Sequence, residues 1–324
     1  MTTTAVTPYT IGPVTCAPGD RAQGLIPVGA HSYGVQLGIP LLVVNGAAPG
    51  PVLCVDGGVH GDEYEGMEAV RRVVATTDPE TLRGTLVGIP CVNTPAFEAG
   101  ARTSGLDHAN LNRIFPGDAD GSYSLRLAAT FVDQVIPAID ALVDLHTGGT
   151  FGEIAPLTIV QGGYEELATP IGLAAGHELI WKGGSWGGTA RLSTLQAGKP
   201  AITIEAGGGT YREEIVDLHL GSVRNIMRQL GMVEGEAELR TGYTAVSGTF
   251  ARSADGGFFL GHAGPGEQCK EGDLIGTITD HYGTVLEEVR APWDGIVLWV
   301  RRLRTVRPGD EVVIFGGVEG EIRP

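Results

Sequence analysis

Apolar and polar residues alternate along residues 40–232 in a way that predicts strands and helices in turn. Short apolar runs such as 52–55 and 141–145 are bounded by glycine, proline or charged residues, which is typical of buried strands. Residues 65–75 and 122–136 instead carry apolar side chains at helical spacing. We therefore expect an α/β fold, with a mostly parallel, twisted sheet that has helices on both faces.

The pattern changes after about residue 235. The polar segment 234–242 is typical of a domain boundary, and beyond it short β-branched runs such as 295–300 and 311–315 are separated by glycine-containing turns. Such spacing predicts short strands in an all-β arrangement. We expect two domains: residues 1–236 hold the α/β sheet, and residues 237–324 form a small β-rich module.

Charge narrows the possible partners. The formal net charge of −16 opposes binding to nucleic acid and to anionic lipid. No apolar run approaches the roughly 18–20 residues that span a bilayer, and the first residues lack the basic and apolar regions of a signal peptide. We expect a cytoplasmic protein with neither nucleic acid nor membrane as a partner. A basic cluster suggests a solvated strand edge or a subunit contact, which leaves a homo-oligomer open; its members are Arg301, Arg302, Arg304 and Arg307.

Glycine and cysteine add two further expectations. The 51 glycines predict many turns and close backbone approaches. The four cysteines lie far apart, and Cys54 and Cys91 fall in apolar runs, so we expect buried free thiols. Neither a disulfide framework nor a thiolate metal site is indicated.

The sharpest chemical feature is segment 56–66, which follows a predicted strand and opens a predicted helix. Ligands in open α/β sheets bind at the carboxyl ends of strands. His60 and Glu63 lie three residues apart there and can face one point. With one distant histidine they would make the three-ligand site of a catalytic zinc. The alternative for such a pair is a surface or helix-capping role.

The candidate third ligand is His146, which directly follows the apolar run 141–145. A histidine at a strand end is otherwise simply hydrogen bonded. Asp144, two residues earlier, either supports His146 from behind or faces the other way, depending on how regular the strand is at its end.

Glu205 closes a predicted strand at residues 201–204, and the glycines 207–209 after it are expected to leave open space. A carboxylate in this place suits a general base that takes a proton from the attacking water and returns it to the leaving amine. The alternative is a cap for the next helix. Asp62 and Glu65, the other nearby carboxylates, are expected to point elsewhere around their turn.

Residues 102–117 form a long, polar stretch that is costly to order unless it is used. Arginines in it can hold a substrate carboxylate in a bidentate manner or stabilise an oxyanion. A surface loop with structural salt bridges is the alternative.

In this order the four segments resemble the succinylglutamate desuccinylase/aspartoacylase family, relatives of the zinc carboxypeptidases, over nearly the whole chain. The likeness is closest to the branch that includes N-acetyl-diaminobutyrate deacetylases. It implies a zinc carboxypeptidase-like fold and one zinc ion per chain. By the resemblance, the zinc ligands are His60, Glu63 and His146.

The same resemblance assigns roles to four further residues. Glu205 matches the catalytic carboxylate, and Asn112 and Arg113 match the pair that binds the carboxylate of the substrate. Arg102 is similar to the arginine that polarises the carbonyl. The implied activity is hydrolysis of the amide bond of a small N-acyl amino acid.

Two other functions stay open. The same metal and arginine set would serve a metallocarboxypeptidase acting on short peptides, and a non-catalytic binding protein could keep the fold. Ligand type favours zinc, although iron, cobalt or manganese also fit two histidines and one carboxylate.

The module at residues 237–324 resembles the barrel-sandwich shape of biotinyl and lipoyl carriers. A carrier needs a lysine at the tip of its hairpin, and the only lysine after residue 200, Lys270, lies well before that tip. We expect instead that the module covers or narrows the mouth of the active site, as the resemblance implies.

Overall fold

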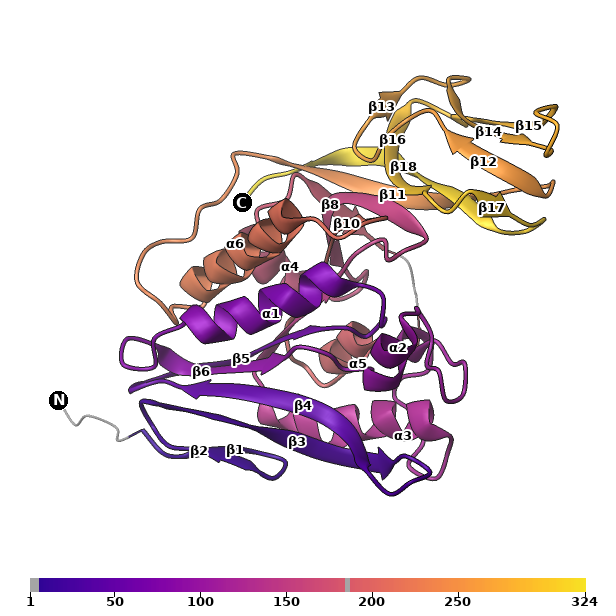
Figure 1. Ribbon diagram of the computed structural model, residues 1–324. Coiled ribbons are helices and arrows are strands. Elements are labelled where there is room, and N and C mark those ends of the chain that lie inside the picture. Colours follow the sequence, from indigo (N-terminus) through magenta and orange to yellow (C-terminus); the bar gives the residue numbers. More distant parts are fainter. Residues whose placement is uncertain (1–5, 184–186) are drawn as a thin grey trace.

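The computed structural model describes residues 6–183 and 187–324, and within them one large β-sheet of 12 strands runs through the molecule (Figure 1). Its strands are β3 (Asp20–Ala30), β4 (Gln36–Asn45), β5 (Ala48–Gly57), β6 (Arg83–Ile89), β7 (Ala141–His146), β8 (Gly152–Val160), β9 (Leu179–Lys182), β10 (Ala201–Gly208), β11 (Tyr243–Arg252), β13 (Gln268–Cys269), β16 (Gly295–Arg301) and β18 (Glu311–Ile322). They lie side by side in the order β13-β16-β18-β11-β9-β8-β10-β7-β5-β6-β4-β3.

This sheet is mixed, and the expected mostly parallel arrangement holds only for two groups of neighbouring strands, of which one is β8, β9 and β11. Strands β10, β7, β5 and β6 run parallel, whereas β8 is antiparallel to β10, β4 to β6 and β3 to β4. Residues 147–151 alone join β7 to β8, and residues 31–35 join β3 to β4. Such connections are too short for the crossover that parallel strands need, so the chain must reverse.

Helices cover both faces of the sheet, as expected. On one face α1 (Tyr64–Thr76), α4 (Glu165–Ala174) and α6 (Glu213–Gln229) pack side by side, and α3 (Tyr123–Thr130) and α5 (Ala190–Gln196) lie on the other (Figure 1). A short helix, α2 (Thr94–Ala99), lies beside the β5–α1 turn.

The helix expected at residues 122–136 is less regular than its spacing suggests. Regular α-helix ends at Thr130, and a π-helical turn (Phe131–Val135) and a 3-10 turn (Ile136–Ala138) continue it. Pro137 explains the change. In a regular α-helix its ring would clash with the carbonyl group of the residue four positions earlier, and proline has no backbone N–H to donate.

After α6 the chain forms only β-strands, as expected for the C-terminal part. A second sheet of four strands contains β12 (Gly257–Gly261), β14 (Leu274–Thr279), β15 (Val285–Arg290) and β17 (Thr305–Val306). An apolar cluster that includes Phe259, Val297 and Phe315 joins it to the large sheet. Because β11 pairs with β9 and β16 pairs with β8, the two parts of the chain share one sheet. The division at 236/237 stays a prediction.

The main core lies between the central strands and the helices, where side chains such as Leu53, Leu86 and Val143 are fully buried. A separate two-stranded hairpin, β1 (Tyr9–Ile11) and β2 (Val14–Cys16), packs against β3 and β4. All four cysteines are buried free thiols, as expected. In the described parts of the chain, none of the helices combines the length and the apolar character needed to cross a bilayer.

Candidate metal centre and active site

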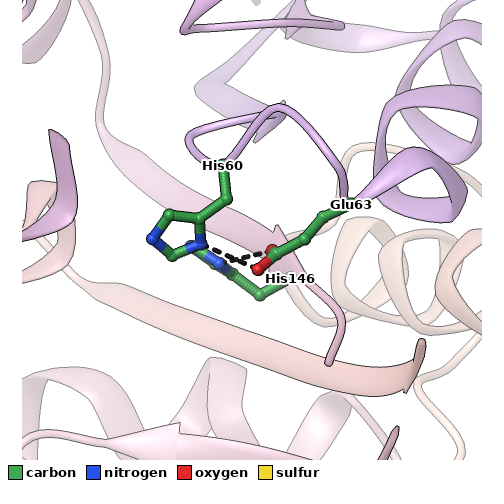
Figure 2. A group of neighbouring side chains, drawn as sticks. All are labelled: His60, Glu63 and His146. Carbon is green, nitrogen blue, oxygen red and sulfur yellow. Dashed lines mark hydrogen bonds and ion pairs between the residues drawn. The ribbon is translucent and has the colours of Figure 1, made fainter. Parts of the chain in front are cut away.

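Two of the expected ligands lie in the turn between β5 and α1, and the third ends β7 (Figure 2). Since β5 and β7 are parallel neighbours, the turn that holds His60 and Glu63 comes out at the same edge of the sheet as His146. Gly61 shapes this turn, because a Cβ there would lie 1.9 Å from the backbone of Ala96 in α2. Only glycine allows the turn to pack so closely on its neighbour.

The three side chains converge with their Nδ1 and carboxylate atoms. His60 Nδ1 lies 2.8 Å from Glu63 Oε1, and His146 Nδ1 lies 2.8 Å from Glu63 Oε2. All three residues are buried, and one ligand atom of each lies within 4.8 Å of the others. Two imidazole nitrogens and one carboxylate oxygen are the donor set of many catalytic zinc sites.

The far side of each imidazole faces an oxygen. His60 Nε2 is 3.1 Å from Asn110 Oδ1, and His146 Nε2 is 2.9 Å from Asp144 Oδ1. Oxygen acceptors there favour a proton on each Nε2, so each Nδ1 is the nitrogen that can bind a metal ion beside Glu63. The residues therefore fit a divalent metal ion bound through Nδ1, Nδ1 and a carboxylate oxygen.

Burial and charge within the cluster give two of the three residues the protonation state that metal binding requires. Burial lowers the pKa of His60 to about 4, assisted by the nearby Arg102, so this imidazole is neutral at pH 7. Burial alone would raise the pKa of Glu63, but the adjoining His60 and His146 hold it well below its usual range. Burial alone would lower the pKa of His146, but the adjoining Asp144 and Glu63 raise it well above its usual range, so this imidazole would release a proton when a metal binds.

Glu205 reaches the site from the neighbouring strand β10, where it pairs in register with His146. It lines the same cavity, of about 510 Å³, as His60 and His146. Burial raises the pKa of Glu205 to about 8; His146 opposes this shift and Glu63 adds to it. A carboxyl group with a pKa near neutrality can both accept and return a proton.

The glycines after Glu205 do not leave open space, contrary to our expectation. A Cβ on Gly208 would lie 2.5 Å from the carbonyl oxygen of Gly152 and 2.7 Å from the backbone of Gly148. The end of β10 is therefore pressed onto the loop that follows β7. Strand β10 continues to Gly208, and α6 begins only at Glu213, so Glu205 is not a helix cap.

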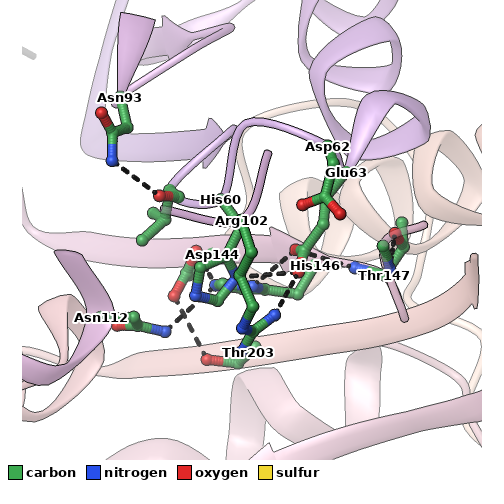
Figure 3. Close-up of polar contacts among 12 residues, drawn as sticks. His60, Asp62, Glu63, Asn93, Arg102, Asn112, Asp144, His146, Thr147 and Thr203 are labelled. Carbon is green, nitrogen blue, oxygen red and sulfur yellow. Dashed lines mark hydrogen bonds and ion pairs between the residues drawn. The ribbon is translucent and has the colours of Figure 1, made fainter. Parts of the chain in front are cut away.

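The long loop places its three expected residues around the same cavity, and Figure 3 shows two of them, Arg102 and Asn112. Arg102 Nη1 donates to Glu63 Oε1 at 3.0 Å. Asn112 Nδ2 lies 3.4 Å from His146 Nε2, and Arg113 donates to the carbonyl oxygen of Asn112 at 2.7 Å. Burial lowers the pKa of Arg113, helped by the charge of Arg102.

A chain of polar contacts behind His146 was missed in the sequence, and Figure 3 shows its part from Thr203 to Asp144. Buried Arg191 donates to Thr203 Oγ1 at 2.7 Å, and Thr203 donates to Asp144 Oδ2 at 3.4 Å. Asp144 thus supports His146 rather than facing away. Thr203 could have been found, since strand alternation puts it on the face of Glu205. Arg191 gave no signal, because its helix was not expected.

Two further cavity residues correct the sequence interpretation. Asp62 lines the cavity instead of pointing elsewhere, and its Oδ2 accepts hydrogen bonds from the Thr150 amide and hydroxyl, both at 2.9 Å. Glu65 does point away, toward the Arg212 amide. Arg301 is not a solvated edge residue: its side chain is 9% exposed and lines the cavity.

Comparison with known proteins gives a consistent family. Residues 49–230 match the succinylglutamate desuccinylase/aspartoacylase catalytic domain. The chain is 30% identical over 294 residues, 86% of each chain, to the N-alpha-acetyl-L-2,4-diaminobutyric acid deacetylase of Halomonas elongata.

Solved structures show the same fold over almost the full length. The product-bound ectoine utilization protein EutE (DoeB) from Ruegeria pomeroyi superposes with a TM-score of 0.85 at 27% identity, covering 96% of this chain and 98% of that one. A succinylglutamate desuccinylase/aspartoacylase from Rhodobacter sphaeroides gives 0.84 at 26% identity, covering 92% and 96%.

Proposed function

The chain belongs to the succinylglutamate desuccinylase/aspartoacylase family, and from this premise we propose that it is a zinc-dependent hydrolase of the amide bond in N-acyl amino acids. The convergence of His60, Glu63 and His146 on one point, with Glu205 beside them in one cavity, carries the proposal. A zinc ion held by these three side chains would polarise the amide carbonyl and lower the pKa of a water molecule.

The two arginines of the long loop contact different parts of the substrate in this proposal. Arg113 and Asn112 both line the cavity, and Asn112 lies beside His146, so a guanidinium and an amide can bind the substrate carboxylate. Arg102 is held beside Glu63, so its remaining N–H groups can stabilise negative charge that develops on the carbonyl oxygen.

Glu205 is the proton carrier in this proposal. It comes from a different strand than the three ligands, so it approaches the reacting centre from another side. In ionised form it takes a proton from the attacking water, and in protonated form it gives that proton to the departing nitrogen. A pKa of about 8 in the absence of metal leaves both forms accessible near neutral pH.

The most direct test of the proposed function combines metal analysis with activity measurements on a panel of substrates. We expect the purified protein to hold one zinc per chain and to deacetylate N-acetyl amino acids faster than it cleaves dipeptides. N-acetyl-L-2,4-diaminobutyrate belongs in the panel because the Halomonas relative is named for it. His60→Ala and His146→Ala should each lose both zinc and activity, since each variant keeps only two of the three protein ligands.

Three results would change the proposal. Full activity after complete removal of metal would exclude zinc dependence, and stoichiometric zinc in either histidine variant would exclude that ligand. Faster cleavage of dipeptides than of acetylated amino acids would make the protein a carboxypeptidase instead.

A further inference from the structure

The cavity extends beyond the catalytic residues, along the face of the sheet toward the C-terminal strands. Thr203, Ile159 and Trp181 are in register on the neighbouring strands β10, β8 and β9. Residues in register point to the same face of a sheet, and all three line the cavity. The floor thus changes within two strands from a hydroxyl beside the metal centre to an apolar surface.

Two indole rings on this floor are each seated on a glycine. A Cβ on Gly248 would lie 2.2 Å from the ring of Trp181, and a Cβ on Gly152 would lie 2.2 Å from the ring of Trp299. Glycine inside a strand commonly marks the close approach of another group. Here it lets each ring lie against the backbone of a neighbouring strand, and both tryptophans line the cavity. The remaining apolar walls are Phe151, Ile154, Phe250 and Ile314.

The charged groups at the rim of this aromatic half are already paired with one another. Arg301 donates to the carbonyl oxygens of Leu303 and Thr305 and lies 3.3 Å from Asp310 Oδ2. Arg252 and Glu311 form an ion pair at 2.6 Å. A charged substituent would therefore have to compete for partners that these groups already hold.

We propose that this aromatic half of the cavity is a specificity site for an apolar substituent, an aliphatic or aromatic group, on the amide substrate. The inference rests on the proposed function, because it takes the cavity to be the substrate site. An acetyl group and a small side chain would leave much of the roughly 510 Å³ unfilled. The apolar group is carried by either the amino-acid side chain or the acyl group.

Kinetics with matched substrates test the proposal and identify which half of the substrate carries the group. N-acetyl-L-leucine and N-acetyl-L-phenylalanine place it on the side chain, N-hexanoyl-L-alanine places it on the acyl group, and N-acetyl-L-alanine lacks it. At least one of the three larger substrates should have a kcat/KM about tenfold or more above that of N-acetyl-L-alanine, because each buried methylene contributes to discrimination. N-acetyl-L-2,4-diaminobutyrate serves as the cationic comparison.

Substitutions in the aromatic half of the cavity test whether its side chains cause the substrate preference. Trp299→Ala should reduce the ratio of kcat/KM between the favoured substrate and N-acetyl-L-alanine at least about fivefold. Phe250→Ala, which alters another aromatic residue of the cavity lining, should do the same if Trp299→Ala does not fold. Trp293→Ala is the matched control: this tryptophan is 39% exposed, packs on Phe315 and is outside the cavity lining. Its ratio should not change.

A binding measurement separates this inference from the proposed function. Calorimetry compares leucine with alanine and hexanoate with acetate, so it needs no turnover. Tighter binding of either larger ligand supports the apolar site even if no amide is hydrolysed. In that case the proposed hydrolase function is wrong and the apolar site stands. The proposal is overturned if neither larger ligand is favoured in binding or turnover, if the diaminobutyrate compound is preferred, or if neither wall variant alters the ratio.

Discussion

Glu205 is the residue at which proton transfer and metal binding can be separated. Glutamine keeps the size of the side chain but can neither accept nor return the proton. Because Glu205 comes from β10 and the three ligands come from elsewhere, we expect Glu205→Gln to keep near-normal zinc content and fold. Turnover should fall at least about a hundredfold, the lower range for loss of an acid–base group.

The measurements are kcat together with metal analysis and circular dichroism of the same preparation. Activity within tenfold of the parent would remove Glu205 from the reaction. Simultaneous loss of zinc would make it a ligand.

Arg113 is the second residue whose role can be measured directly. Arg113→Ala should raise KM for substrates with a free carboxylate by about thirtyfold, since a charge-assisted arginine–carboxylate contact is worth on the order of 2 kcal/mol. Substrates in which that carboxylate is amidated should be affected much less. Equal losses for both series would mean that Arg113, which also bonds the Asn112 carbonyl, acts through the loop rather than through the carboxylate.

Among the secondary-structure elements, β8 and α6 are joined through a buried histidine that has no part in the metal centre. His177 Nδ1 lies 3.2 Å from Thr158 Oγ1 of β8, and its Nε2 lies 3.2 Å from Ser222 Oγ of α6. Burial lowers the pKa of His177 to about 4, from an ordinary value of 6.5. The folded protein therefore holds this imidazole in its neutral form.

The shift predicts a pH-dependent loss of stability with a definite sign. Below about pH 6.5 the unfolded chain takes up a proton at His177 and the folded chain does not, until the pH approaches about 4. The free energy of unfolding should fall in that window by up to about 1.4 kcal/mol per pH unit from this residue. His177→Gln, which can still bond both hydroxyls, should reduce the slope.

Urea unfolding of both proteins at pH 7 and pH 5, with a chelator present throughout, measures the difference. Identical pH dependence in the two proteins would show that His177 is protonated in the folded state or does not contribute.

At the scale of the whole molecule, the C-terminal strands are part of the same structure as the catalytic strands. Apolar residues of β8 and β9, such as Ile154 and Trp181, pack with Val246, Leu298 and Ile314 in one buried cluster. A fragment of residues 1–236 would expose this surface. We expect it to aggregate or to unfold without a cooperative transition, as seen by gel filtration and thermal circular dichroism.

The matched control is the full chain cleaved at a protease site inserted in the segment 234–242, which should stay associated because both pieces are present. A monomeric fragment of residues 1–236 with a cooperative unfolding transition would contradict this view. It would also support an independent domain with that boundary.

Local pattern was sufficient for the elements that carry the metal centre. Strands β5 and β7 are short apolar runs, α1 has helical spacing, and His60, Glu63 and His146 lie just beyond strand ends. Parallel strands align their carboxyl ends at one edge, so convergence of these side chains could be expected from the sequence. Strand alternation should also have identified Thr203, two residues before Glu205.

Only the tertiary structure decided the features that depend on which distant segments become neighbours. The reversed direction of β8 follows from a five-residue connection, and it places Ile159 beside Trp181 and Trp299 beside Gly152. The cavity position of Arg301 depends on β16 pairing with β8, about 150 residues away in the chain. Hydrophobic periodicity reports whether a residue is buried, but not what it is buried against. The convergence of His60, Glu63 and His146 was therefore predictable from the chain itself, whereas the aromatic half of the cavity was decided by strand pairing.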